Sequence, residues 1–341
     1  MVCAGVLAVS LRAATDLSPT AIPLAIDSQE RLLVVAPHPD DEVLGAGGLM
    51  QRVLERGGSV LVVLVTAGDG YVEAVIHATG QPRPRPSVYV AYGKRRIRES
   101  RTALRGLGGG RVRLEFLGFP DGGLERLLHL HWQRRHPERS LTTGASDPPY
   151  PDALEPDVPY DGADLRRELV DLLRATTPTI VALPDPLDHH PDHSAAGLFT
   201  LLALDDWLAQ SPARPPTMPR LLAYLVHWPD WPPGWDAPPP PPDTSGGTLE
   251  LPPNLPLRGL GRTALTLTDE EITAKRAALD AYVTQQEEMA ALLAAFVRRT
   301  EPFTVLTAAD LQHLGKIIER PGPRNGGRGE AGRKNRMRDA S

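Results

Sequence analysis

The stretch RLLVVAP, from Arg31 to Pro37, is followed directly by HPDDEVLGAGGLMQRVLERGG, from His38 to Gly58. The first part is a short apolar run of the kind that forms a strand buried on both faces. The second part opens with charged residues and continues with the apolar spacing of a helix, which two glycines end. A buried strand, a charged loop and a helix in this order predict the first unit of an α/β protein.

The same alternation continues along the chain. Further strands are predicted over 59–68, 111–119, 179–185 and 221–228. Helices are predicted over 92–107, from the capping residue Asp161 onward, and over 194–208. We therefore predict a Rossmann-like parallel sheet with helices on both faces, in which ligands bind at the carboxyl ends of the strands.

The rest of the chain is predicted to add to this core, which covers residues 29–228. Residues 229–267 are rich in proline, which predicts an extended excursion. Residues 268–319 are predicted to be a helical addition with one long helix over 268–298, started by a capping box. Residues 320–341 carry seven basic and two acidic residues, which predicts a disordered basic tail. Residues 1–28 form an N-terminal segment.

Composition narrows the classes of protein. The net charge of −5 gives no basic field, so we expect no specific nucleic-acid partner. The only cysteine is Cys3, which excludes an internal disulfide and a thiolate metal site. No apolar run is long enough to span a membrane, so we expect a soluble bacterial protein without a transmembrane segment. Residues 1–14 resemble the end of a signal peptide but lack its basic region, so both a cytoplasmic and an exported location remain open. The sequence also leaves the oligomeric state open.

Two charged clusters follow predicted strands. HPDDE, residues 38–42, places three carboxylates and an imidazole together, an arrangement that repulsion makes costly unless a cation or donor offsets it. DHHPDH, residues 188–193, follows the strand 179–185. If the two strands are neighbours, the clusters face each other. Two imidazoles and one carboxylate suit Zn²⁺ with a water at the open position.

The two clusters resemble the PIG-L/LmbE-like zinc de-N-acetylases, which include deacetylases of N-acetylglucosaminyl-phosphatidylinositol and of mycothiol and bacillithiol biosynthesis. The motifs that carry the resemblance are PHPDDE at 37–42 and HPDH at 190–193. Weaker matches occur in the same order, namely VTAGDG (65–70), RIRESRTALRGLG (96–108), FPDGGL (119–124) and KRAALDAYVTQ (275–285). The resemblance covers roughly residues 31–228 and implies hydrolysis of an N-acetyl group, most naturally on an N-acetylglucosamine-containing small molecule or glycoconjugate.

The resemblance also implies roles for individual residues. His38, Asp41 and His193 would hold the zinc ion. Asp40 would be the general base for a metal-activated water. His190 would stabilise the oxyanion and help to protonate the departing amine.

Six more residues receive supporting roles. Asp188 and Asp192 would orient the histidines. There are four candidates for substrate binding. Asp69 and Asp121 lie next to glycine-rich turns, Arg96 lies on the surface of a predicted helix, and His227 lies at the end of a predicted strand.

Two other functions remain open at this point. The DHH triplet at 188–190 also suits a two-metal phosphoesterase, and the fold could serve a non-catalytic glycan-binding module. The irregular segment 121–160, the proline-rich excursion and the tail fit none of the thiol-biosynthesis enzymes closely, which leaves the substrate open.

Overall fold

The computed structural model describes residues 22–133, 135–210, 217–237, 247–256 and 260–310. The signal-like stretch, the five prolines at 238–242 and the tail at 320–341 lie outside the described residues. No helix within the described ranges combines the length and apolar character needed to cross a bilayer.

The described residues form one eight-stranded sheet with the order β1-β7-β8-β6-β5-β2-β3-β4. Five neighbouring strands run parallel, namely β2 (Arg31–Ala36), β3 (Ser59–Thr66), β4 (Val112–Phe119), β5 (Ile180–Pro184) and β6 (Arg220–Tyr224). The edge beyond β6 consists of β8 (Thr300–Leu306), β7 (Gly261–Thr266) and β1 (Ile22–Pro23), with β8 antiparallel to both neighbours. The predicted α/β fold is confirmed, and the sheet is mixed rather than wholly parallel.

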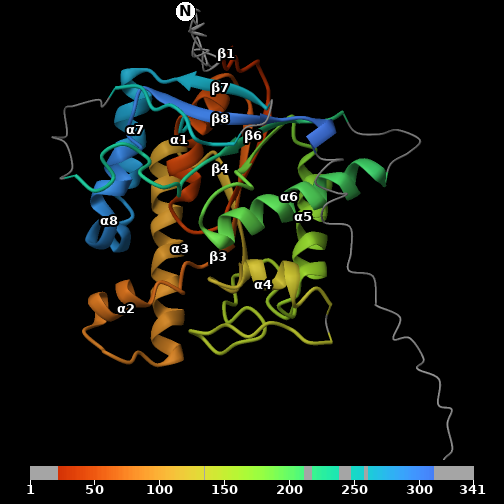
Figure 1. Cartoon of the computed structure of the whole chain (residues 1–341), viewed down its shortest axis with the longest axis vertical. Helices are drawn as coiled ribbons and strands as arrows, with labels where there is room; N and C mark the ends of the chain where they lie inside the picture. Colours follow the sequence, from red (N-terminus) through yellow and green to blue (C-terminus); the bar gives the residue numbers. More distant parts are fainter. Residues whose placement is uncertain (1–21, 134, 211–216, 238–246, 257–259, 311–341) are drawn as a thin grey trace, which may run out of the picture.

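Helices cover both faces of the sheet (Figure 1). One face carries α1 (Asp41–Glu55), α3 (Pro86–Gly108), α7 (Asp269–Leu279) and α8 (Val283–Ala295), with α2 (Val72–Thr79) against α3 and α8. The other carries α4 (Leu124–His129), α5 (Gly162–Thr176) and α6 (Pro191–Ala209). Alternate residues of β2 enter the two cores: Leu32 and Val34 lie in one, Leu33 and Val35 in the other. A strand buried on both faces explains the continuous apolar run at residues 32–36.

The prediction of a single long helix over 268–298 is wrong. The capping box of Thr268 and Glu271 is present and starts α7, but the chain turns at residues 280–282 before α8 begins. Tyr282 is completely buried at this turn, whereas the next residue, Val283, is 45% exposed. The later ranges of the chain also contribute β7 and β8 to the sheet, so the sheet extends beyond the range 29–228 predicted for the core.

Helix α1 is interrupted at Ala46, whose backbone leaves helical geometry. Two elements from the end of the chain satisfy the groups freed by this break. Glu301 of β8 accepts the N–H groups of Gly48 at 2.7 Å and Leu49 at 2.9 Å. Lys275 of α7 donates to the carbonyl of Leu44 and to Glu301. The buried ion pair therefore replaces backbone bonds that an unbroken helix would make.

Candidate functional site

The candidate site lies at the carboxyl edge of the parallel strands. The loop that carries His38 follows β2, and the loop 185–190 follows β5, which pairs directly with β2. The chain builds the sheet in one direction from β2 to β4 and then continues on the other side with β5, so this is the switch point at which such sheets bind ligands. A pocket of about 350 Å³ opens here, within the range of small-molecule sites.

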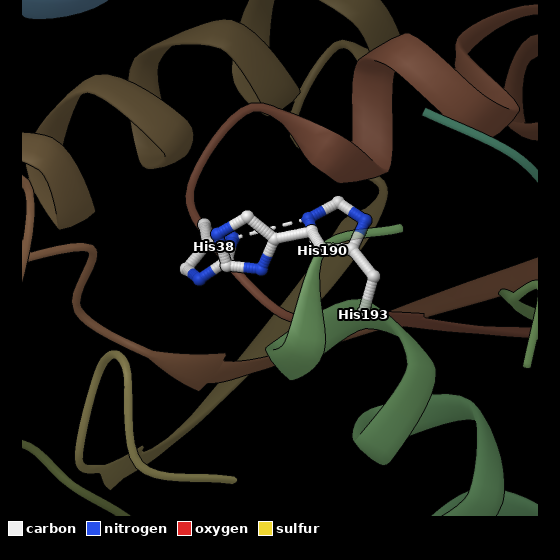
Figure 2. Close-up of side chains that lie close together, drawn as sticks. All are labelled: His38, His190 and His193. Carbon is white, nitrogen blue, oxygen red and sulfur yellow. Dashed lines mark hydrogen bonds between the residues drawn. The ribbon is translucent and has the colours of Figure 1, made fainter. Parts of the chain in front are cut away.

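Three side chains converge beside the pocket, namely His38 from the loop after β2, Asp41 from the first turn of α1 and His193 from the first turn of α6. His38 Nδ1 lies 3.2 Å from His193 Nε2 and 3.3 Å from Asp41 Oδ2, and His193 Nε2 lies 3.1 Å from the same carboxylate oxygen. Figure 2 shows His38, His190 and His193 with their rings gathered together. His38, Asp41 and His193, whose donor atoms form a triangle, are all buried.

The triangle fits a tetrahedral metal ion. At Zn–ligand distances of about 2.0–2.1 Å, neighbouring ligand atoms of a tetrahedral site lie about 3.3 Å apart. Two imidazole nitrogens and one carboxylate oxygen are also the donor set that Zn²⁺ accepts while keeping a position for water. Within the described residues, two further sets that share His38 lie close enough to hold an ion: the three histidines His38, His190 and His193, and His38 with Asp121 and Asp192; Asp41 belongs to neither.

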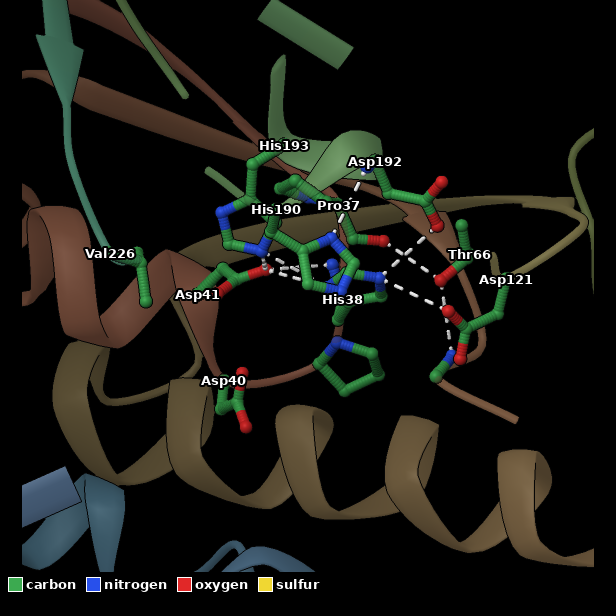
Figure 3. Close-up of polar contacts among 12 residues, drawn as sticks. Pro37, His38, Asp40, Asp41, Thr66, Asp121, His190, Asp192, His193 and Val226 are labelled. Carbon is green, nitrogen blue, oxygen red and sulfur yellow. Dashed lines mark hydrogen bonds and ion pairs between the residues drawn. The ribbon is translucent and has the colours of Figure 1, made fainter. Parts of the chain in front are cut away.

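Carboxylates hold the far nitrogens of the two buried histidines (Figure 3). His38 Nε2 lies 3.2 Å from Asp121 Oδ1 and 3.4 Å from Asp192 Oδ2. Burial would lower the pKa of His38, but these carboxylates outweigh it and raise the pKa well above its usual value. His193 Nδ1 lies 3.5 Å from Asp188 Oδ2. Burial is likewise outweighed there, by Asp41 and Asp188, which raise the pKa of His193 to about 9.

Asp188 and Asp192 are themselves fixed by backbone donors. Asp188 accepts the N–H groups of His190, Val226 and His227. Asp192 accepts those of Gly122 at 2.7 Å and Leu124 at 3.0 Å. Each carboxylate therefore joins a histidine to a neighbouring loop, which orients the ring.

Asp40 lines the pocket beside the triangle. Its backbone has φ 118°, a conformation that a residue with a side chain adopts only at a cost of about 1–3 kcal/mol. Arg96 donates to its Oδ2 at 3.2 Å. Burial raises the pKa of Asp40 to about 8, with Arg96 opposing and the carboxylates of Asp41 and Glu42 adding to the rise.

His190 also lines the pocket, and its ring has a defined orientation. Its Nδ1 accepts the N–H of Asp192 at 3.2 Å, as the cap of α6. An imidazole whose Nδ1 is an acceptor carries its proton on Nε2 when neutral. Burial and the nearby imidazoles of His38, His193 and His227 lower the pKa of His190, which favours that neutral form.

The candidates for substrate binding have different environments. Arg96 is buried and donates to the carbonyls of Gly68 and Pro39, yet it reaches the pocket. Asp121 and His227 line the pocket as well. Asp69 does not: its carboxylate accepts the hydroxyl of Tyr150, and burial raises its pKa to about 7.

The structure adds pocket residues that the sequence did not indicate. They come from α1, the start of α2 and α8, and include Leu44, Tyr71, Glu73, Gln285, Met289 and Leu292. Gln285 lies in the weak match KRAALDAYVTQ, which was the one available signal for α8. The remaining residues have no local pattern that distinguishes a pocket wall from a core or a surface.

Fold and site together define a class: an α/β protein with a buried His and carboxylate centre at the switch point of its sheet. A family model described as PIG-L: GlcNAc-PI de-N-acetylase matches residues 33–204, half of the chain. The chain belongs to the PIG-L family of de-N-acetylases.

Individual relatives support the same membership. A 1D-myo-inositol 2-acetamido-2-deoxy-alpha-D-glucopyranoside deacetylase of Saccharopolyspora erythraea is 32% identical over 177 residues, covering 50% of this chain and 55% of that protein. The diacetylchitobiose deacetylase of Thermococcus kodakarensis is 25% identical over 178 residues, covering 51% of this chain and 49% of that protein. The chain thus matches about half the length of these relatives.

A solved structure shares the fold over a longer range. The A40926 pseudoaglycone deacetylase Dbv21 superimposes with a TM-score of 0.50 and 21% identity, covering 82% of this chain and 97% of the other. At this identity the likeness concerns the fold alone.

Proposed function

We propose that the protein hydrolyses the N-acetyl group of an N-acetylglucosamine-containing small molecule or glycoconjugate, with Zn²⁺ held by His38, Asp41 and His193. The observation that carries this proposal is the triangle of donor atoms, with sides of 3.1–3.3 Å, two members of which, His38 and Asp41, line the pocket together with Asp40 and His190. The two curated relatives are named for substrates that contain an N-acetylated glucosamine unit, which supports the same class of substrate.

Asp40 and His190 would supply the base and the hydrogen-bond donor for the reaction. When bound, Zn²⁺ supplies Lewis-acid chemistry that makes a water more acidic and a carbonyl more electrophilic. Asp40 accepts the proton of the attacking water, and His190 donates a hydrogen bond from Nε2–H to the oxygen of the tetrahedral intermediate. The C–N bond then breaks, the proton held by Asp40 leaves with the amine, and acetate is the second product.

The phosphoesterase alternative has less support from the geometry. Its DHH triplet would need all three side chains near the metals. His189 instead packs its ring on Trp228 at 4.5 Å, and Asp188 is occupied by three backbone N–H groups. The triplet therefore offers only one residue, His190, to the pocket.

The test is release of acetate from a panel of N-acetylglucosamine conjugates by zinc-loaded protein. We expect turnover by the wild type and a loss of about 10²–10⁴-fold in kcat for Asp40→Asn, with zinc still bound, because the base is lost and the ligands are kept. Asp152→Asn, at an exposed carboxylate paired with Arg101, is the matched control and should keep full activity.

Other outcomes would contradict the proposal in distinct ways. Two metal ions per chain with phosphodiester cleavage would favour the phosphoesterase. Zinc-loaded protein that binds a glycan and never releases acetate would favour the binding module. Full activity of Asp40→Asn would remove the assigned base.

A further inference from the structure

The turn between α7 and α8 lies against the loop that carries Asp40. Tyr282 and Gln285, from this turn and the first turn of α8, are both 0% exposed. They lie more than 70 residues beyond the end of the segment that the family model matches. Neither residue contacts the donor triangle in any interaction of the described residues.

Tyr282 supports the backbone of Asp40 through Glu42. The hydroxyl of Tyr282 donates to Glu42 Oε1 at 2.6 Å. The other oxygen of the same carboxylate accepts the backbone N–H of Asp40 at 2.9 Å. Glu42 is completely buried, so its oxygens depend on protein donors, and these two are among them.

Gln285 supports the side chain of Asp40 through Arg96. With the amide oxygen of Gln285 facing the guanidinium, as the surrounding groups require, it accepts from Nε and Nη2 of Arg96, each at 2.9 Å. The same Nη2 donates to Asp40 Oδ2 at 3.2 Å. Arg96 is 4% exposed, so its direction is set by these bonds and by the carbonyls of Gly68 and Pro39.

We infer that Tyr282 and Gln285 are positioning residues that hold Asp40 in its working orientation, one through its backbone and the other through its carboxylate. This inference rests on the proposed role of Asp40 as the base. The left-handed backbone of Asp40 gives the two supports a reason to exist, because such a conformation persists only where the surroundings fix it. A misplaced base costs rate rather than affinity for the metal or the substrate.

The first experiment replaces Gln285 by leucine, with Gln286→Leu as the matched control. Gln286 is the next residue on α8, and its amide donates only to the carbonyl of Leu279 among the described contacts. We expect kcat of Gln285→Leu to fall about 10-fold or more on the best substrate of the acetate screen, with KM and the zinc dissociation constant within about twofold. Gln286→Leu should keep kcat within about twofold.

Rescue by a conservative variant separates positioning from a structural effect. Gln285→Glu retains an oxygen acceptor for Arg96, so its kcat should exceed that of Gln285→Leu at equal folded fraction. A raised KM with unchanged kcat in Gln285→Leu would mean that Gln285 contacts the substrate directly, and would overturn the inference. Equal kcat in the leucine and glutamate variants would overturn it as well.

The second experiment does not depend on turnover. Tyr282→Phe removes one hydroxyl, and hydrogen exchange reports the amide of Asp40 in a peptide covering residues 38–44. We expect faster exchange of this peptide than in wild type, and unchanged exchange in Gln286→Leu. Unchanged exchange in Tyr282→Phe would contradict the backbone support even if no substrate had been found. Absence of acetate release by the wild type would instead contradict the proposed function.

Discussion

At the scale of single residues, Asp121 has the clearest untested role. Its Oδ1 faces His38 Nε2 at 3.2 Å, and its Oδ2 accepts the N–H of Gly70. Although burial opposes it, the charge of His38 lowers the pKa of Asp121, so this carboxylate stays ionised. It is therefore placed to fix the ring of His38 with Nδ1 toward the triangle.

We expect Asp121→Asn to weaken zinc binding by about 10–100-fold, because the amide no longer fixes and polarises the His38 ring. Competition with a chromophoric chelator measures this affinity. Asp236→Asn, at an exposed aspartate, should bind zinc like the wild type. Wild-type affinity in Asp121→Asn would leave this residue only its predicted place in substrate binding.

The sequence indicated the residues that meet at the site better than it indicated the residues that hold them in place. His38, Asp40 and Asp41 lie within four residues, and His190 and His193 are three residues apart, so two short motifs were enough to suggest them. Asp121 was assigned to the substrate because its contact with His38 joins loops 83 residues apart, which no local pattern records. Gln285 stood in a weak motif whose purpose only its contact with Arg96 makes apparent.

At the scale of elements, the break in α1 depends on partners from the end of the chain. Lys275 and Glu301 are both about as buried as core residues, at 1% and 2% exposed. Removing the lysine would leave the carboxylate of Glu301 in the core without its counter-charge, although two backbone donors would remain.

We expect Lys275→Met to lower the free energy of unfolding by about 3–5 kcal/mol, the usual cost of removing one partner of a buried ion pair. Denaturant titration measures the change. Lys94→Met, at an exposed lysine on α3, is the matched control and should change stability by less than about 0.5 kcal/mol. A similar small change for Lys275→Met would show that the two backbone donors suffice for Glu301.

The sequence predicted best the elements that carry a clear local signal, either a continuous apolar run or a capping motif. The buried strands β2 and β3 read as continuous apolar runs, and the capping box located the start of α7 within a residue. The turn at 280–282 was missed because Ala281 and Tyr282 suit a helix locally. The burial of Tyr282 against Glu42 favours the turn instead, and that contact spans 240 residues.

At the scale of the whole molecule, stability should depend on pH through a buried acid remote from the site. Glu168 of α5 is 1% exposed, and neither of its carboxylate oxygens has a hydrogen-bond partner among the described residues. Burial raises the pKa of Glu168 from 4.5 to about 8. The folded state therefore holds a proton that the unfolded chain releases.

Because the folded pKa is the higher one, this stabilisation is complete below pH 4.5 and is lost as pH rises to about 8. We expect Glu168→Gln to be more stable than wild type by about 1–3 kcal/mol at pH 9 and nearly equal at pH 5. Unfolding curves at the two pH values measure this. Glu125→Gln, at an exposed position, should give the same difference from wild type at both. A pH-independent effect of Glu168→Gln would refute the buried proton.

The sequence predicted the sheet only for its parallel strands. The alternation of strand and helix predicted their parallel arrangement, whereas the pairing of β2 with β5 was only a condition of the predicted site and is observed in the structure. Strand β7 lies within the range 229–267, which was predicted to be a proline-rich excursion, and the antiparallel strand β8 follows the helices α7 and α8. The pattern therefore suggested additions rather than parts of the sheet. Their membership in the sheet is a property of long-range pairing.

The support of Asp40 by residues 282 and 285 has a consequence for the order of events on the ribosome. Synthesis proceeds from the N-terminus, so Glu42 and Arg96 leave the ribosome well before residues 282 and 285 are made. Until then both side chains lack the Tyr282 and Gln285 partners through which Asp40 is supported. The orientation of Asp40 is therefore completed only after the turn that follows α7 has been synthesised.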